Sequence, residues 1–156
     1  MRSVAMCLAL VLLSCESARE LDDTEACIAD HPPGVPFDVG DVVVASPPPG
    51  SNLPEPAPPS AADIAQECAL SGGAGCDPEA FISKAAASCI ATLHEFSPGV
   101  EPWQIALTYH HGHERVVWNV MNQTAADGSD GYGGEVLTID ATEGEVLETS
   151  AYRAVP

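Results

Sequence analysis

The sequence predicts an α+β domain in which one main helix packs on an antiparallel sheet of about four strands. Three features indicate this fold class: an alanine-rich helix-forming segment, a segment of strict apolar–polar alternation, and a later alternating segment divided by a turn. They follow one another in the C-terminal half of the 156-residue chain. A domain this small buries limited apolar surface, so we expect disulfides to contribute to its stability.

The main helix is expected within residues 81–96, FISKAAASCIATLHEF. Ser83 is a suitable N-cap, because its hydroxyl can accept a hydrogen bond from the first helical turn. Ala86, Ile90 and Leu93 follow at i, i+4 and i+7 and form one apolar face. A shorter helix is expected in the preceding AADIAQECAL, before the glycine-rich SGGAG.

Two strands are expected at residues 103–109 and 114–121. The first alternates strictly, with tryptophan, isoleucine, leucine and tyrosine on one face. A two-residue turn at His111 and Gly112 would pair Leu107 with Val116 and place the apolar residues of both strands on the same face. We therefore predict a β-hairpin with Gly112 in its turn.

A second hairpin is expected within residues 134–152, with residues 142–144 as a three-residue loop. Gly144 suits the left-handed conformation that such a loop requires. The expected pairs are Ile139 with Leu147 and Leu137 with Thr149.

The first 14 residues contain one basic side chain, Arg2, and then an apolar run too short to span a bilayer. Leu12, Ser14 and Cys15 match the lipobox, so this part of the chain resembles bacterial lipoproteins. The resemblance implies a signal peptide over residues 1–14, cleavage before Cys15, and lipidation of that cysteine, with acyl chains such as palmitate anchoring the protein to the membrane. The alternative is an ordinary signal peptide.

The implied location is the extracytoplasmic side of the bacterial cell envelope, at the inner or the outer membrane. The chain carries a formal net charge of −18 and would repel nucleic acids and anionic head groups. We therefore expect no nucleic-acid partner.

Residues 15–61 are acidic, and ten of the 14 prolines of the chain fall between Pro32 and Pro59. Such a segment favours extended polyproline II conformation and predicts a disordered, semi-rigid spacer. DVVVA at residues 41–45 could form a short strand within it. The small α+β domain is expected to occupy residues 62–156.

The C-terminal domain resembles PepSY-type domains over residues 81–153. FISKAAASCIA corresponds to the helix of that family, VWNV to its aromatic-centred strand, and VLTIDATEGEVL, with Asp140 and Gly144, to its hairpin. The resemblance implies an extracytoplasmic module without catalytic residues and with a protein partner, such as a peptidase that it restrains.

Four cysteines remain besides Cys7 in the signal and Cys15, an even number that predicts two disulfides in an exported chain. Their gaps do not supply the close CxxC pairs of a zinc site. Pro78 disfavours helix before Glu79, and the resemblance starts the main helix at Ser83. The chain before that helix is therefore long enough for Cys76 to fold back beside it. We expect the pairs Cys76–Cys89 and Cys27–Cys68, with Cys68–Cys76 and Cys27–Cys89 as the alternative.

Residues 109–114, YHHGHE, gather three histidines. In the expected register His110 and His113 project from the same outward face and could chelate a metal weakly, whereas His111 lies in the turn and Glu114 points to the other face. We interpret them as exposed turn histidines. No metalloprotease, GxSxG or phosphate-binding motif is present, so the sequence predicts neither an enzyme nor a cofactor.

The preferred function is a membrane-tethered, non-catalytic binding or protease-modulating module. A structural envelope lipoprotein is a second possibility, favoured by the spacer and the acidity. Weak metal binding through residues 110–113 is a third.

Overall fold

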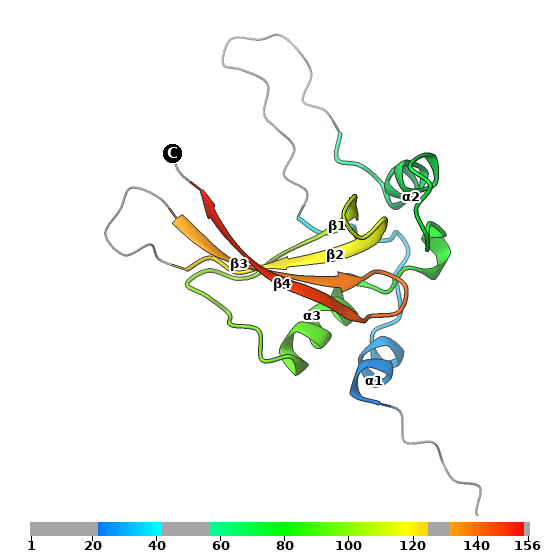
Figure 1. The fold of residues 1–156 in the computed structure, drawn as a ribbon. Coiled ribbons are helices and arrows are strands. Elements are labelled where there is room, and N and C mark those ends of the chain that lie inside the picture. Colours follow the sequence, from blue (N-terminus) through cyan, green and yellow to red (C-terminus); the bar gives the residue numbers. More distant parts are fainter. Residues whose placement is uncertain (1–21, 42–56, 125–131, 155–156) are drawn as a thin grey trace, which may run out of the picture.

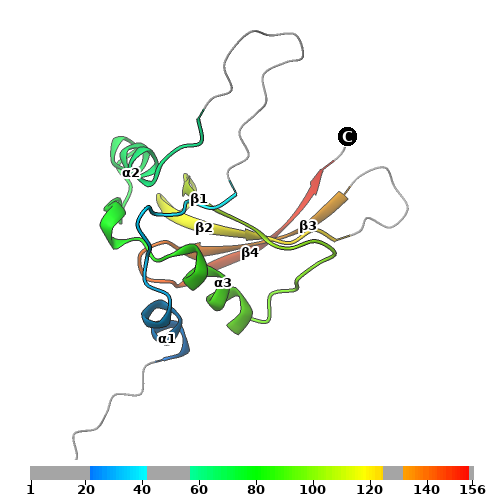
Figure 2. The same cartoon turned by 180° about the vertical axis from the view of Figure 1, so that it is seen from behind.

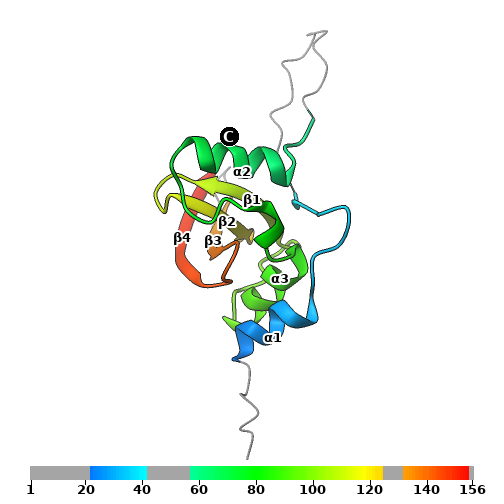
Figure 3. The same cartoon turned by 90° about the vertical axis from the view of Figure 1, so that its right-hand side faces the viewer.

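The computed structural model describes residues 22–41, 57–124 and 132–154, and it has the α+β fold class that the sequence predicts (Figure 1). Four antiparallel strands form one sheet in the order β1-β2-β3-β4, so each strand pairs with its neighbours in the sequence. The strands are β1 (Gln104–His110), β2 (Arg115–Met121), β3 (Tyr132–Asp140) and β4 (Val146–Ala154). The sheet is strongly twisted in all three views (Figures 1, 2 and 3).

The β1–β2 hairpin has a longer turn than expected. Leu107 pairs with Trp118 instead of Val116, and residues 111–114 form a four-residue turn in which Glu114 adopts a φ of 53°. The expected two-residue turn of His111 and Gly112 is therefore wrong, although Gly112 does lie in the turn. The pairing shifts by two residues, and such a shift keeps every side chain on the expected face of the sheet.

The β3–β4 hairpin follows the prediction more closely. Leu137 pairs with Thr149 as expected, and Gly144 has a φ of 73°. Ile139, however, pairs with Val146 instead of Leu147, because the register shifts between Thr138 and Ile139. A Cβ atom at position 144 would lie 2.9 Å from Ile90 Cδ1, the end of a flexible side chain, so the left-handed backbone is the stronger reason for glycine there.

Three α-helices accompany the sheet: α1 (Asp23–Asp30), α2 (Ala61–Leu70) and α3 (Lys84–Leu93). Ser83 is the N-cap of α3, as predicted, and its hydroxyl accepts from Ala86 N–H at 3.0 Å. Because α2 and α3 both have ten residues, a single main helix is not what the structure shows. A short 3₁₀-helix, η1 (Pro78–Ala80), connects them.

The core lies between α3 and the face of the sheet that carries Leu107, Trp118 and Ile139, which we call the inner face (Figure 2). Trp118 has no exposed surface, and its indole N–H donates to the Ile82 carbonyl at 3.0 Å. The opposite, outer face carries Thr108, Val117, Thr138 and Glu148. Helix α1 lies beside α3, and α2 lies at the other end of the domain (Figure 3).

Part of the expected spacer packs on the domain. Asp22 caps α1 by accepting from Glu25 N–H at 2.8 Å, and Cys27 of this helix is buried. Asp41 N–H donates to the Ile105 carbonyl at 2.8 Å, at the edge of the sheet. Residues 22–41 therefore belong structurally to the α+β domain. Of the expected strand at 41–45, residues 42–45 lie outside the described residues.

Two disulfides join the four cysteines, in the alternative pairing and not in the preferred one. Cys27 bonds to Cys89 and Cys68 to Cys76, with Cα–Cα distances of 5.7 and 5.6 Å. Cys76 does not reach α3, because the SGGAG turn returns the chain to the end of α2. Gly73 makes this return possible, since a Cβ there would lie 2.7 Å from the Glu114 carbonyl oxygen.

Candidate functional site

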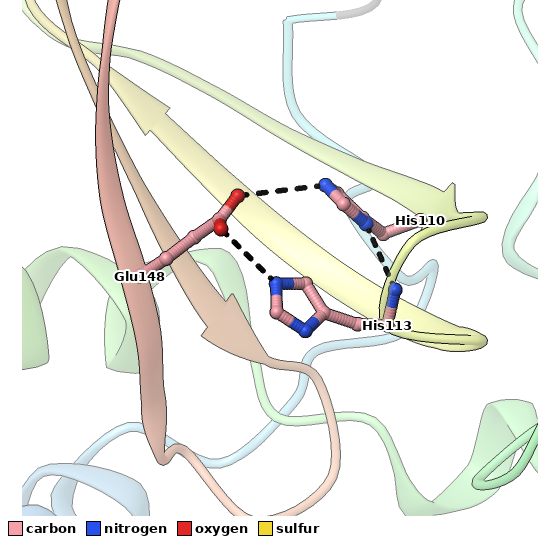
Figure 4. A group of neighbouring side chains, drawn as sticks. All are labelled: His110, His113 and Glu148. Carbon is pink, nitrogen blue, oxygen red and sulfur yellow. Dashed lines mark hydrogen bonds and ion pairs between the residues drawn. The ribbon is translucent and has the colours of Figure 1, made fainter.

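Two histidines and a glutamate converge on the outer face of the sheet (Figure 4). His110 ends β1, His113 lies in the β1–β2 turn, and Glu148 lies on β4. His110 Nε2 lies 3.7 Å from Glu148 Oε1, and His113 Nε2 lies 3.4 Å from Oε2 of the same carboxylate. One ligand atom from each residue lies within 4.8 Å of the others, so these three residues could hold a metal ion.

The longer turn explains how His113 reaches its position. His110 pairs with Arg115, so His113 lies within the turn and not in a cross-strand pair with His110. The His113 N–H donates to His110 Nδ1 at 3.2 Å, and the two imidazole centroids are 4.6 Å apart. The Cys68–Cys76 loop supports this turn from the other side, because Ala74 N–H donates to the Glu114 carbonyl at 2.9 Å.

The hydrogen bond to Nδ1 determines where the His110 proton lies. An atom that accepts from an N–H carries no proton itself, so neutral His110 is protonated on Nε2, the nitrogen that faces Glu148. His113 has no such constraint among the hydrogen bonds of the described residues. The site can thus combine a carboxylate, one proton-donating imidazole and one imidazole with a choice of tautomer.

The other residues of YHHGHE point elsewhere. His111 Nε2 lies 3.7 Å from Glu67 Oε1 on α2, and its ring meets Tyr109 edge-on at 4.8 Å. His111 is therefore outside the group, as its place in the turn predicts.

Beside the site, Arg115 and Asp140 form an ion pair of 2.8 Å. Burial raises the pKa of Asp140, but hydrogen bonds from the Thr142 hydroxyl, from the backbone N–H groups of Glu143 and Thr142, and from Arg115 outweigh it and hold that pKa below its usual value. Asp140 is thus a structural carboxylate. It binds the Arg115 guanidinium, which is the one guanidinium near the histidines among the described residues.

A second candidate surface is a groove of about 360 Å³ between α2 and the β1 edge of the sheet. Its apolar floor includes Ile64 and Leu107, and acidic groups stand at its rim. Those acidic residues are Asp41, Asp63 and Glu67.

Two of these rim carboxylates have a lowered pKa. The Ile105 N–H and the Lys84 ammonium lower the pKa of Asp41 against the opposing effect of burial. The backbone N–H and hydroxyl of Ser60 lower the pKa of Asp63 in the capping box of α2. The rim is therefore negatively charged at neutral pH.

Sequence reasoning found His110 and His113 but missed Glu148. The expected pairing of Leu137 with Thr149 already put Glu148 on the outer face, which was a usable signal. The missing information was spatial: β1 and β4 are the two edge strands of the sheet, and only its twist brings Glu148 to the tip of the β1–β2 hairpin.

No family model matches the chain, nor does any curated protein or solved structure. The PepSY-type and lipoprotein resemblances therefore stay predictions, and Cys15 lies outside the described residues. Within the part of the chain that the structure describes, no helix is long and apolar enough to cross a membrane.

Proposed function

We propose that the protein is a lipid-anchored, extracytoplasmic, non-catalytic module that binds a protein partner through the groove between α2 and β1. The groove is the observation that carries this proposal, since its volume of about 360 Å³ is within the range of ligand-binding pockets, roughly 300–1,000 Å³. The two disulfides support an oxidising, extracytoplasmic location.

The charges of the groove indicate the partner. Glu67 and Asp63 stand on the exposed side of α2, above a floor that includes Leu107 and Met121. Asp41 at the same rim already pairs with Lys84 at 3.2 Å. A lysine or arginine side chain suits such a surface, because its apolar stem can pack on the floor while its charged head meets the exposed carboxylates of Asp63 and Glu67.

The overall charge favours the same kind of partner. A chain with a formal net charge of −18 attracts basic segments over long range and accelerates their encounter. The proposed ligand is therefore a basic segment of another extracytoplasmic protein, and a peptidase is one such partner.

The test compares captured proteins between variants of the full-length chain. Wild type, Glu67→Gln, Ala106→Trp and the control Glu143→Gln serve as baits in detergent-solubilised envelopes, with mass spectrometry of what they retain. Glu67→Gln removes a rim charge, Ala106→Trp fills the groove, and Glu143 is an exposed acid in the β3–β4 turn, away from the groove. Thermal unfolding of each bait shows that it is folded.

The proposal expects a basic protein that wild type and Glu143→Gln retain and both groove variants lose. Equal retention by all four baits would mean that the groove is not the binding surface. If the wild-type bait retains no protein above background, a structural envelope lipoprotein is favoured instead.

A further inference from the structure

We propose that His110, His113 and Glu148 form a binding site for one divalent transition-metal ion, with Zn(II) as the probe. This site lies on the outer face of the sheet and is distinct from the groove, so the inference does not rest on the proposed function. Imidazole and carboxylate are a ligand set that Zn(II) uses widely.

The geometry is close to that of a bound ion. Ligands at about 2.0–2.1 Å from a tetrahedral Zn(II) lie roughly 3.3 Å from one another. One oxygen of Glu148, Oε2, already meets this spacing with His113, at 3.4 Å, and the other, Oε1, nearly meets it with His110, at 3.7 Å. The largest separation in the group is below 4.8 Å, so rotation of half-exposed side chains can close it.

The charge of the site also favours a cation. Glu148 is the negative ligand, and the nearby Arg115 guanidinium points to Asp140 at 2.8 Å instead of to Glu148. The carboxylate therefore has no permanent positive partner among the described residues, only the two imidazoles. A bound metal ion would replace these long contacts between the two imidazoles and the Glu148 carboxylate.

One existing contact limits the affinity. Zn(II) on His110 Nε2 displaces the proton from that nitrogen, and the neutral ring must then carry its proton on Nδ1. The hydrogen bond from His113 N–H to Nδ1 is lost. This loss, together with the partial exposure of all three ligands, predicts a dissociation constant in the micromolar range, about 1–50 μM.

The ligand count predicts how the ion would be coordinated. Two imidazoles and one carboxylate leave a tetrahedral Zn(II) with a fourth position for water or for an external donor. Because each ligand side chain is between 29 and 41 % exposed, that position faces solvent. The site is thus expected to exchange its metal readily.

The test is calorimetric titration of ZnCl₂ into the full-length, tag-free protein in detergent, with both disulfides formed. We expect one equivalent to bind wild type. His113→Ala and Glu148→Gln should each weaken binding about tenfold or more, since each removes one of three ligands. His111→Ala is the matched control, because His111 lies in the same turn but faces Glu67. It should change the dissociation constant less than about twofold.

Electron paramagnetic resonance of one equivalent of Cu(II) provides a direct view of the ligands. Wild type and His111→Ala should show coupling to two imidazole nitrogens, and His113→Ala to one. Thermal unfolding without metal verifies that each variant is folded. A dissociation constant for Zn(II) above about 1 mM, or no detectable binding, would overturn the proposal. So would equal affinity of all variants, which would mean adventitious chelation at the surface.

Discussion

Asp140 accepts a hydrogen bond from the Arg115 guanidinium at 2.8 Å, and only 3 % of Asp140 is exposed to solvent. Its Oδ1 atom also accepts from the Thr142 hydroxyl and from the N–H groups of Thr142 and Glu143, all within 2.8 Å. One carboxylate thereby fixes the β3–β4 turn and joins it to the start of β2. Hydrogen bonds to a charged group of this kind are among the stronger polar contacts in proteins.

Replacing this carboxylate should destabilise the fold. In Asp140→Asn the negative partner of Arg115 is lost. In addition, the new amide N–H₂ group replaces one carboxylate oxygen, so at least one hydrogen-bond donor that now meets Oδ1 or Oδ2 faces another donor. We expect a loss of about 2 kcal/mol in the free energy of unfolding, measured by urea titration. Glu143→Gln, an exposed change in the same turn, should stay within about 0.5 kcal/mol of wild type.

The same carboxylate predicts an acid transition. Because the folded-state pKa of Asp140 is lowered, its contribution is fully present above the unfolded-state value of about 3.9 and is lost as the pH falls through the folded-state pKa. Urea titrations between pH 7 and pH 2 should therefore show stability falling below about pH 4, and less steeply in Asp140→Asn. An identical pH slope in the two proteins would contradict this assignment.

The two disulfides should differ in their effect on stability. Cys27–Cys89 spans 62 residues and Cys68–Cys76 spans eight. The conformational entropy that a disulfide removes from the unfolded chain grows with the length of the loop that it closes. Alanine replacement of the longer pair should cost about 4 kcal/mol, against about 2.5 kcal/mol for the shorter. Peptide mapping under non-reducing conditions checks the pairing itself: a Cys76–Cys89 peptide would contradict the structure, and four free thiols would remove the argument for an oxidising compartment.

Features set by neighbouring residues were predictable. Ser83 caps α3 because the hydroxyl lies three residues from its donor, and Gly144 is left-handed because a short loop demands it. The β1–β2 turn was not predictable from the same pattern. Registers that differ by two residues put identical side chains on the inner face, so the apolar alternation cannot distinguish them. A glutamate with a positive φ, as at Glu114, also leaves no signal in the sequence.

Features that depend on distant contacts were the ones missed. The disulfide pairing depends on α1, which begins in an acidic, proline-rich region yet packs on α3 through Cys27. Asp22 before DTEACIAD was the local signal for this helix, since it is the N-cap in the structure. Glu148 joins the histidines only through the twist of the whole sheet.

Lipidation at Cys15 remains a prediction from the lipobox and has a direct test. Cys15→Ser should abolish the partition of the protein into the detergent phase of a Triton X-114 separation, because no acyl chain is attached. Cys7→Ser is the matched control, since Cys7 lies inside the expected signal peptide and should leave partition unchanged. Equal partition of Cys15→Ser and wild type would exclude a lipid anchor at this residue.

The end of α3 offers a stabilising substitution. Phe96 N–H donates to the Ala91 carbonyl and Glu95 N–H to the Thr92 carbonyl, which together form a Schellman motif with Glu95 at its left-handed position. Glu95 has a φ of 53°, a conformation that costs a residue with a Cβ roughly 1–2 kcal/mol and glycine almost nothing.

Glu95→Gly should therefore raise the free energy of unfolding by about 0.5–1 kcal/mol, after the greater freedom of glycine in the unfolded chain is deducted. The melting temperature should rise by roughly 2–5 °C in a thermal unfolding measurement followed by circular dichroism. Glu95→Gln is the control, because it removes the negative charge near the C-terminus of α3 without relieving the left-handed backbone. It should raise the free energy of unfolding by only a few tenths of a kcal/mol. If Gln stabilises as much as Gly, the charge and not the left-handed backbone is responsible. If Gly destabilises, the Glu95 side chain makes a contact that the conformational gain does not offset.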